Sequence, residues 1–516
     1  MKQRCSRLLG CSVTASAQFC LGMLAFSACS FGDGEPRLAV HTKAGRVTAA
    51  SPTPGIQLPT PPGTTNLSDI PPLPAGTGKR NVIVMIGDGM QMAHEVATSR
   101  YLYDSDQGLS FHSLPVRAFK TTWDVNVYTA RAQALGVAGY SPEQFDPSVG
   151  YDPKIGGKSP YPIEPDSDTK RAYFVGGPYP DSASTATAMS TGLKTLSAAI
   201  GVPPEFTGNN ASEHASSLLR RFYGMSVGFV TTVQFYHATP SGFFAHNVSR
   251  NAYSELAHEL MTEVMPEVMI GGGFGRGEFD EADLLHLQGT GNYVYAHRQT
   301  GVDGGDTILA AASRAVQGGK RLFGLYGNLE EGNFSPPKPA DNPGNPTTTR
   351  GSLEDPTLAD ASIAALQVLS QDKDGFFIMI EQGDIDRANH ANDFARMIGC
   401  VSDLDAAVRA AIGFVDNPND DIDWNNTTLI VTADHANSYM RFTRTLHSGD
   451  LPTQAGSTYP DGEITYGWGS HTSELVNVYV KGYAESLVAA YETPYPGLPI
   501  IDDTSIYRLI VDAARR

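Results

Sequence analysis

Cysteine is scarce in the body of this chain. Four of the five cysteines lie within the first 29 residues, and only Cys400 remains beyond them. A single cysteine cannot close an internal disulfide, so packing or bound metal ions must stabilise the body of the protein. The sequence therefore excludes a small scaffold held together by disulfides.

Positive charge is also in short supply. Lys and Arg number 37 against 55 Asp and Glu, which gives a formal net charge of −18. This balance excludes binding to nucleic acid or to an anionic membrane through bulk charge. It also means that an anionic ligand would need a locally positive site.

Long apolar runs are missing as well. The longest mostly apolar stretch, Leu8 to Phe26, is interrupted by Ser, Thr and Gln, which makes it a poor membrane span. Basic residues precede it at Lys2, Arg4 and Arg7. A positive start followed by such a stretch predicts an export signal over residues 1–29.

The signal ends in a motif with two readings. Phe26-Ser27-Ala28-Cys29 resembles a bacterial lipobox, whose cysteine would be lipidated after cleavage. The alternative is an ordinary signal peptide in which Cys29 is incidental. Residues 30–80 are rich in Pro, Gly and Thr and predict a semi-extended linker. A long linker after a lipidation site favours an enzyme held above a membrane, so we expect an exported protein, either periplasmic or anchored as a lipoprotein in a bacterial cell envelope.

The body of the chain has a different pattern, in which short apolar runs alternate with helix-like segments. The chain of 516 residues, 41% hydrophobic and 18% charged, is long enough to bury a large core. Runs typical of buried strands lie at 82–86, 226–232, 376–380, 429–432 and 476–480, and helical segments lie, for example, at 358–370 and 392–414. This pattern predicts an α/β catalytic domain over residues 81–516, with a large, mainly parallel sheet covered by helices on both faces.

Acidic residues stand at the ends of three of these strands: Asp88, Glu381 and Asp434. In open α/β sheets the ligand site lies beyond the carboxyl ends of the strands. The three acids therefore indicate a metal site assembled from distant parts of the chain.

Histidines follow the same strands. Asp386 and His390 are four residues apart, so on a helix they share one face. Such a pair alone is usually a cap or a surface feature, but here it follows a buried strand. His435 directly follows Asp434, and His471 adds a third imidazole. Carboxylate and imidazole together suit zinc.

Ser182 follows a turn rich in Pro and Gly and precedes a helix of small residues. At the N-terminus of that helix, free backbone N–H groups and the helix dipole would favour an anion such as phosphate. The alternative is that Ser182 is an ordinary N-cap. Ser182 does not lie in a G-x-S-x-G elbow, so its surroundings give no support to a hydrolase triad.

Together these motifs resemble those of the alkaline phosphatase family, in that family's order. The resemblance covers residues from about Asn81 to the C-terminus, and it rests on six segments: Val84 to Met90 with Asp88, Asp181-Ser182-Ala183, His237 to Pro240 with Arg250 downstream, Glu381 with Asp386 and His390, Thr432 to Ala436, and Gly469 to Thr472. Each segment alone is a weak signal, but six in order are specific.

The resemblance implies the roles of these residues. One zinc ion would be held by Asp386, His390 and His471, and a second by Asp88, Asp434 and His435. Asp88 would also reach a third ion, usually magnesium, which Thr239 and Glu381 complete. Ser182 would be the nucleophile between the two zinc ions, one bonded to its oxygen and the other stabilising the leaving oxygen, and Arg250 would hold the phosphate oxygens.

The chain departs from the family pattern in two places. His237 stands where some members carry Asp beside the third ion, which could weaken Mg²⁺ or favour zinc there. The segment from Trp123 to Arg171 is an insertion without clear periodicity, and Phe442 to Trp468 is similar. Both predict either plain surface loops or a rim that selects substrates. Arg387, at a site that often carries a basic residue, would assist phosphate at longer range.

The resemblance implies hydrolysis of small phosphate monoesters through a phosphoserine, and a homodimer, since the family is often dimeric. The nearest alternative is a phosphodiesterase of the same superfamily, which typically uses Thr as its nucleophile and lacks the third-metal residues. A sulfatase would need a Cys-x-Pro-x-Arg motif, which the sequence lacks. A noncatalytic surface lipoprotein that binds metal or phosphate is the alternative from another class.

Overall fold

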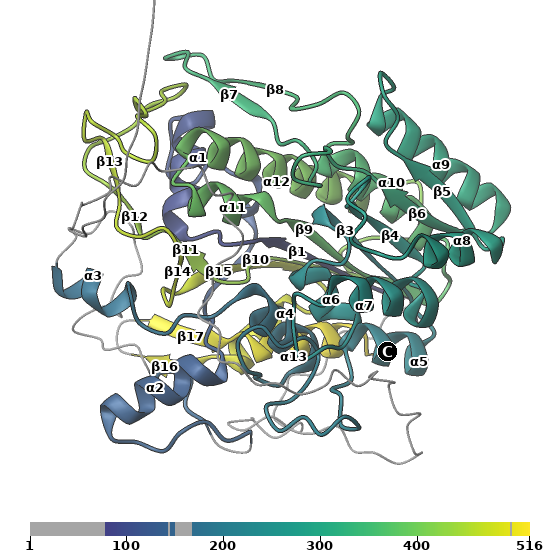
Figure 1. Cartoon of the computed structure of the whole chain (residues 1–516), viewed down its shortest axis with the longest axis horizontal. Coiled ribbons are helices and arrows are strands. Elements are labelled where there is room, and N and C mark those ends of the chain that lie inside the picture. Colours follow the sequence, from purple (N-terminus) through teal and green to yellow (C-terminus); the bar gives the residue numbers. More distant parts are fainter. Residues whose placement is uncertain (1–77, 143–144, 150–167, 496–497, 516) are drawn as a thin grey trace, which may run out of the picture. The chain divides into compact units, whose positions relative to one another are not determined.

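An 11-stranded sheet runs through the protein (Figure 1). The computed structural model describes residues 78–142, 145–149, 168–495 and 498–515, all of which belong to one compact unit, Gly45–Arg516. The predicted signal and all but the last three residues of the predicted linker lie outside the described residues.

The strand order is β16-β17-β2-β15-β10-β1-β9-β3-β4-β6-β5. Seven of the ten neighbouring pairs are parallel. The strands are β1 (Arg80–Gly87), β2 (Val116–Thr121), β3 (Ser226–Gln234), β4 (Val268–Gly272), β5 (Tyr293–His297), β6 (Arg321–Leu325), β9 (Gly375–Gln382), β10 (Thr427–Ala433), β15 (Val476–Gly482), β16 (Thr493–Tyr495) and β17 (Leu498–Asp502).

Short two-stranded sheets lie outside the main sheet. They pair β7 (Lys338–Ala340) with β8 (Thr347–Thr349), β11 (Ala436–Asn437) with β14 (His471–Thr472), and β12 (Met440–Phe442) with β13 (Ile464–Tyr466). The second of these pairs brings His471 beside the segment that follows β10.

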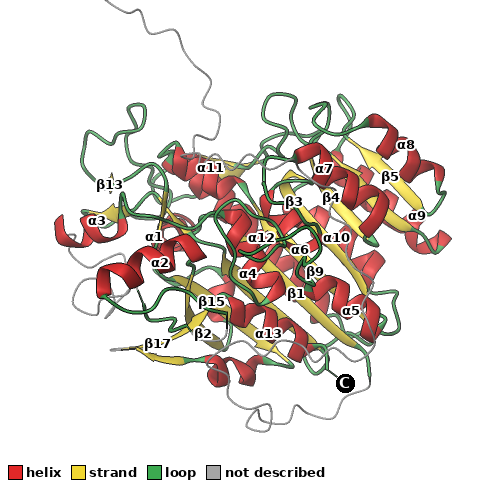
Figure 2. Cartoon of the chain, turned by 60° about the horizontal axis from the view of Figure 1, so that its bottom comes forward, coloured by secondary structure: helices red, strands yellow, loops and turns green. Residues whose placement is uncertain are grey.

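The helices of the described residues connect these strands (Figure 2). They are α1 (Met92–Tyr103), α2 (Val125–Leu135), α3 (Asp168–Phe174), α4 (Ser182–Thr191), α5 (Ala215–Tyr223), α6 (Ala238–Phe244), α7 (Tyr253–Glu259), α8 (Glu281–Gly289), α9 (Gly304–Gly318), α10 (Leu358–Leu369), α11 (Asp384–His390), α12 (Phe394–Val415) and α13 (Thr504–Ala513), with shorter turns η2 (Ser110–Ser113), η4 (Leu260–Val264) and η5 (Glu485–Tyr491).

Helices cover both faces of the sheet, as the sequence predicts. Side chains alternate between the faces along a strand. In β1, Ile83 and Met85 pack with α1, α9, α10 and α12, whereas Val82, Val84 and Ile86 pack with α4, α5, α6 and α13. Both sets are fully buried, which explains why the central strands are apolar throughout.

Strand β15 does not follow the parallel pattern. The sequence predicts a strand at 476–480, and β15 confirms it, but it runs antiparallel to both β10 and β2. The segment between β10 and β15 contains short β-strands and no helix. A parallel return needs a crossover connection, usually a helix, so this strand returns in the opposite direction.

The insertion at Trp123 to Arg171 is more ordered at its start than its lack of periodicity suggests. Helix α2 begins two residues after Trp123, and Asp124 caps it by accepting from Val127 N. Trp123, Val127 and Tyr128 are buried in a small third apolar cluster. Residues 143–144 and 150–167 of this segment lie outside the described residues. A search of the described helices for one long and apolar enough to cross a membrane finds none.

Two buried histidines, His214 and His246, pack against each other, and His246 precedes Arg250 by four residues in the chain. The rings of His214 and His246 lie 4.4 Å apart between centroids. His246 places Nδ1 2.8 Å from Glu259 Oε1 and Nε2 2.9 Å from Ser212 O, so both of its nitrogens face acceptors. Neither ring nitrogen of His214 has a hydrogen-bond partner within the described part of the chain.

These surroundings shift the two histidines in opposite directions. Burial, and then the charge of His246, lower the pKa of His214 well below its usual value. Burial opposes the charged form of His246 as well, but the hydrogen bond and ion pair with Glu259 raise the pKa of His246. His214 is therefore neutral in the folded protein, whereas the unfolded chain would take up a proton near pH 6.5.

We predict that His214→Phe reduces the acid sensitivity of the fold. Below about pH 6.5 the unfolded state binds a proton at His214 that the folded state does not, so wild-type stability falls by about 1.4 kcal/mol per pH unit from this group. Glu259 raises the pKa of His246, which changes the pH dependence of stability in the opposite direction, but this effect is present in both the wild type and His214→Phe. Denaturant unfolding at pH 7 and pH 5 measures the difference, and equal losses in the two proteins would contradict it.

Candidate active site

Three carboxylates gather at one edge of the sheet because three neighbouring parallel strands end there. Asp88 directly follows β1, Asp434 directly follows β10, and Glu381 is the last residue but one of β9. The register pairs Ile86 of β1 with both Glu381 and Thr432. The acids that the sequence places at strand ends therefore lie together at the carboxyl edge of the sheet.

Group II, as we name it, consists of Asp88, Asp434 and His435, whose ligand atoms all lie within 4.8 Å of one another. His435 Nε2 is 3.2 Å from Asp434 Oδ2 and 3.6 Å from Asp88 Oδ1. The backbone N–H groups of Gly89 and His435 both donate to Asp434 Oδ1. These two bonds fix the carboxylate so that Oδ2 faces the imidazole.

Group I consists of Asp386, His390 and His471. Helix α11 places Asp386 and His390 one turn apart, with His390 Nε2 3.2 Å from Asp386 Oδ2. His471 Nε2 lies 3.4 Å from Asp386 Oδ1 and 3.1 Å from His390 Nε2. The predicted pairing of Asp386 and His390 on one helix face is therefore present.

Backbone carbonyls orient both imidazoles of group I. Gly469 O lies 2.9 Å from His390 Nδ1, and Pro180 O lies 2.7 Å from His471 Nδ1. A carbonyl only accepts, so each Nδ1 carries the proton and each Nε2 offers its lone pair to the centre of the group. This is the arrangement that a histidine metal ligand needs.

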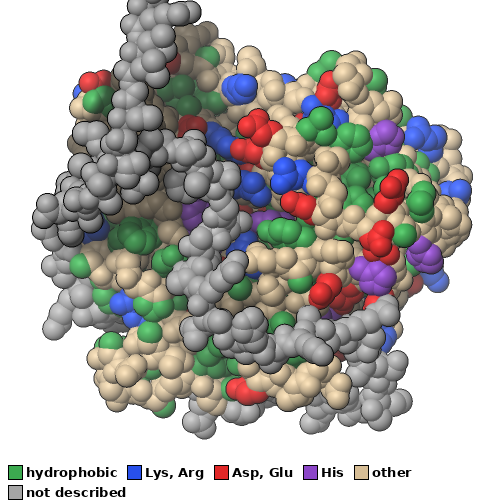
Figure 3. All heavy atoms as spheres, viewed as in Figure 1, with side chains coloured by type: hydrophobic (Ala, Val, Ile, Leu, Met, Phe, Trp, Pro, Cys, Tyr) green, Lys and Arg blue, Asp and Glu red, His purple; other side chains and the backbone are tan. Residues whose placement is uncertain are grey.

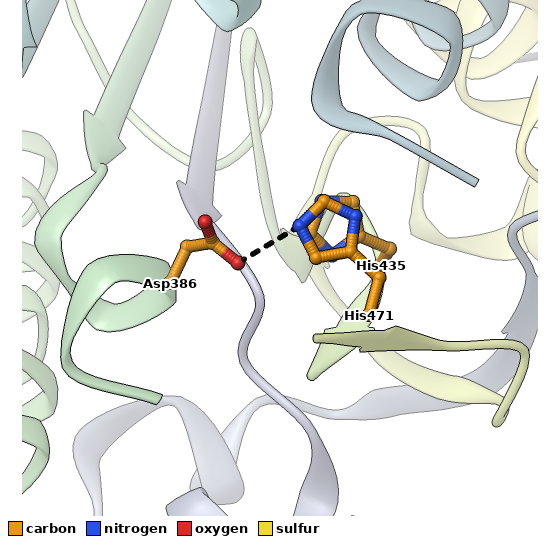
Figure 4. Close-up of side chains that lie close together, drawn as sticks. All are labelled: Asp386, His435 and His471. Carbon is orange, nitrogen blue, oxygen red and sulfur yellow. Dashed lines mark ion pairs between the residues drawn. The ribbon is translucent and has the colours of Figure 1, made fainter. Parts of the chain in front are cut away.

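His435 connects the two groups. Its ring stacks on that of His471, with centroids 3.8 Å apart, and Figure 4 shows the two rings overlapping opposite Asp386. The ligand atoms of Asp386, His435 and His471 also lie within 4.8 Å of one another. Groups I and II therefore lie side by side.

Group III consists of Asp88, Glu381 and His237, with Thr239. The ligand atoms of the first three also lie within 4.8 Å of one another. His237 is the N-cap residue of α6, and Thr239 is buried in its first turn. Thr231 Oγ1 donates to Glu381 Oε2 at 2.5 Å. Asp88 is thus shared between groups II and III, as the resemblance implies.

Ser182 is the first residue of α4. Asp181 is the N-cap and accepts from Ser184 N, so the alternative that Ser182 is itself the N-cap is wrong. Ser182 Oγ lies 3.1 Å from His435 Nε2 and 3.4 Å from each oxygen of Asp88. The hydroxyl therefore stands against group II at the N-terminus of the helix.

Arg250 is held beside this serine by the same cap residue. Its Nη1 donates to Asp181 Oδ2 at 2.8 Å, and Ala198 N donates to Asp181 Oδ1 at 2.9 Å. Burial opposes ionisation of Asp181, but the Arg250 guanidinium lowers the pKa of that carboxyl below its usual range. One carboxylate thus connects the start of α4 to the guanidinium.

The charges of the site are strongly coupled. Burial, and then the neighbouring carboxylates beginning with Asp434, raise the pKa of Asp88 well above its usual value. Burial raises the pKa of Glu381 to about 7. Burial opposes the charged form of Asp386 too, but His390 and His471 hold the pKa of Asp386 well below its usual value. Buried acids crowded in this way either take up protons or are neutralised by cations.

The donor set fits divalent metal ions. Buried atoms of five site residues make no hydrogen bond within the described part of the chain: His237 Nδ1, Thr239 Oγ1, Glu381 Oε1, Asp434 Oδ2 and His435 Nδ1. Burying such atoms without partners is costly. Carboxylate and imidazole are zinc ligands, and oxygen-rich sites suit Mg²⁺. The residues present therefore fit the metals that the resemblance implies.

Two supporting residues could not be recognised in the sequence. Lys120 of β2 is fully buried and places Nζ 3.3 Å from Asp434 O, and burial lowers the pKa of Lys120 to about 8. Asn437 Nδ2 donates to Asp386 Oδ1 at 2.6 Å. In the sequence, the only indication of a role for Asn437 is its position two residues after His435. Nothing in the sequence indicates a role for Lys120, because its contact with Asp434 depends on how distant strands pack.

Arg387 lies at the edge of the site. Its Nη2 donates to Gln234 Oε1 at 3.3 Å, and its side chain is 33% exposed. Together with Arg250 it acts on His237, whose pKa is lowered well below its usual value by burial and then by these two cations. Figure 3 shows basic and acidic side chains close together around partly visible histidines on this face.

Fold and site together define an α/β protein that presents three adjoining ligand groups and a serine at a helix N-terminus. The family model described as alkaline phosphatase matches residues 161–309 and 340–485. This chain belongs to the alkaline phosphatase family. The resemblance inferred from six motifs is thereby confirmed.

Individual relatives agree with this assignment. Alkaline phosphatase 3 of Bacillus subtilis (strain 168) is 29% identical over 364 residues, which cover 69% of this chain and 61% of that protein. Alkaline phosphatase of Escherichia fergusonii is 30% identical over 353 residues, 61% of this chain and 68% of that protein. The chain thus spans about three fifths of the length of its Bacillus relative.

A solved structure shows the same fold. Alkaline phosphatase from the Antarctic bacterium TAB5 has a TM-score of 0.55 and 22% identity, and the match covers 84% of this chain and 98% of that one. A variant of that protein, in which a histidine is replaced by aspartate, is described with Mg bound in its M3 site.

Proposed function

We propose that this chain hydrolyses phosphate monoesters through a phosphoserine at Ser182, with divalent metal ions in groups I, II and III. The observation that carries the proposal is the position of Ser182 Oγ, 3.1 Å from His435 Nε2. His435 belongs to group II, and its ligand atom also lies within 4.8 Å of those of Asp386 and His471, so the nucleophile stands beside group II and close to group I. Membership of the alkaline phosphatase family supports the same chemistry.

The residues of the chain bind and orient the phosphate. Within the described residues the Arg250 guanidinium makes one hydrogen bond, to Asp181, which leaves the rest of its planar fork for phosphate oxygens. The N-terminus of α4 directs backbone N–H groups to the same place. Zinc ions bound in groups I and II would favour the ionised serine and neutralise charge on the leaving oxygen.

Two bond changes follow from this arrangement. Ser182 Oγ gives up its proton to solvent and forms a bond to phosphorus while the bond from phosphorus to the leaving oxygen breaks, and that oxygen takes a proton from solvent and departs as the alcohol. Arg250 keeps the phosphoryl group in place. Water then breaks the phosphoserine bond and releases inorganic phosphate, which restores Ser182. The four site carboxylates alone would repel phosphate, and divalent ions bound in the three groups would reverse this local charge.

Group III is proposed to take the third ion. Its oxygens, from Asp88, Glu381 and Thr239, suit Mg²⁺, whereas the imidazole of His237 suits zinc better. The TAB5 variant with aspartate in place of a histidine is described with Mg bound in the M3 site, which agrees with the preference of magnesium for carboxylate ligands. Magnesium in this chain is therefore proposed to be readily replaced by zinc.

Monoesters are favoured over diesters by the same groups. A monoester carries more negative charge and one more unesterified oxygen than a diester, which suits Arg250 and group III together. Ser182, rather than a threonine, also favours the monoesterase over the related phosphodiesterases. The noncatalytic alternative would leave the nucleophile, the guanidinium and three complete ligand groups without a role.

The cellular setting also remains a proposal. The export signal over residues 1–29, the lipid anchor at Cys29 and the linker over residues 30–80 would place the enzyme in a bacterial cell envelope, either in the periplasm or on its membrane. A homodimer is expected from the family resemblance alone.

We predict that the protein without its leader hydrolyses an aryl phosphate at alkaline pH at least about 10²-fold faster, in kcat/KM, than the bis-aryl phosphate. Chelator should abolish the monoesterase rate, and added Zn²⁺ with Mg²⁺ should restore it. A diesterase rate equal to or above the monoesterase rate, or full activity in chelator, would contradict the proposal.

Ser182→Ala should abolish the phosphoenzyme and leave the zinc content nearly unchanged, because groups I and II each keep three side-chain ligands. Asp434→Asn should instead weaken zinc binding and lower kcat/KM by at least about 10²-fold, or about 2.7 kcal/mol. Metal analysis beside acid-quenched labelling with ³²P separates the two effects. A labelled phosphoenzyme in Ser182→Ala would place the nucleophile elsewhere.

A further inference from the structure

His94 lies outside all three ligand groups and is fully buried in α1. It nevertheless contacts two segments that carry group I. One is α11, which holds Asp386 and His390, and the other is the turn that follows β11, the strand paired with His471.

The hydrogen bonds of His94 fix its protonation. Gln91 N lies 3.2 Å and Asn389 Nδ2 lies 3.1 Å from His94 Nδ1, and both are N–H donors. Nδ1 must therefore be an acceptor, and the proton resides on Nε2, which donates to Ser438 Oγ at 3.3 Å. All the hydrogen-bonding capacity of the ring is used to join three segments.

Asn389 transmits this contact to the helix. Its Nδ2 also donates to Ile385 O at 2.8 Å, so both N–H groups of the amide are used and its orientation is fixed. Asn389 directly precedes His390 and follows Asp386 by three residues. Helix α11 is only seven residues long, and Gly383 at its N-cap offers no side-chain cap. The bond to His94 therefore restrains the rotation of this short helix about its axis.

Ser438 transmits the contact to the other side of group I. It follows Asn437, which donates to Asp386 Oδ1 and pairs with His471. Ser438 and Tyr439 have φ values of 68° and 51°, in the left-handed region that residues other than glycine rarely adopt. Such a turn persists only where its surroundings hold it.

We propose that His94 is a positioning residue for group I. It sets Asp386 and His390 on α11 at the right distance from His471, by accepting from Asn389 and donating to Ser438. The inference rests on the proposed function only in taking group I as a metal site. It concerns metal retention, so it can be tested without measuring activity.

The test compares the wild type with His94→Phe, which keeps an aromatic ring but loses the bonds to Asn389 and Ser438 as well as the bond from Gln91 N. After dialysis against graded chelator, zinc analysis should show one zinc ion bound about tenfold more weakly, with the other ions within about twofold of wild type. Ser438→Ala removes only one of the bonds and should give a smaller loss. Adding it to His94→Phe should cause no further loss, since the bond is already absent.

Tyr101→Phe is the matched control on the same helix. The Tyr101 hydroxyl bonds to Ala340 O and Thr347 O, away from the ligand groups, so this variant loses buried hydrogen bonds without touching group I. It should keep wild-type zinc affinity. Equal zinc loss in the control, or wild-type affinity in both His94→Phe and Ser438→Ala, overturns the inference. A wild type that binds zinc but hydrolyses no phosphate monoester would overturn the proposed function alone.

Discussion

The rest of the site depends on one constraint: the parallel strands β10, β1 and β9 are in register and end at the same edge of the sheet. Their parallel register brings Asp88, Glu381 and Asp434 to one buried edge, where like charges and burial both oppose ionisation. Such a cluster is unfavourable without cations. On the proposed function, metal binding and folding would be coupled, because each ion would neutralise carboxylates that the fold brings together.

Much of this arrangement could be predicted from the sequence. Buried parallel strands are continuous apolar runs, so 82–86, 376–380 and 429–432 were visible, and with them the acids at their ends. The direction of β15 was not visible, because it depends on how the chain returns after β10. Lys120, Asn437 and His94 were missed for a related reason, since their contacts join segments that only the folded chain brings together.

Groups I and II differ in how they are supported. Group II stands at the ends of central strands, with Gly89 and His435 donating directly to Asp434. Group I combines a short helix with a two-residue strand, and its geometry depends on Asn437 and on the carbonyls of Pro180 and Gly469. Side chains in its surroundings should therefore affect metal retention at group I more strongly than at group II.

The central claim is that two metal ions adjoin Ser182 in the ligand groups described. Anomalous diffraction from crystals of the zinc-loaded protein, measured on both sides of the zinc absorption edge, tests it most directly. The account predicts one peak among Asp386, His390 and His471 and a second among Asp88, Asp434 and His435, with Ser182 Oγ beside them. No peak at either group, or zinc bound only elsewhere in the chain, would contradict it.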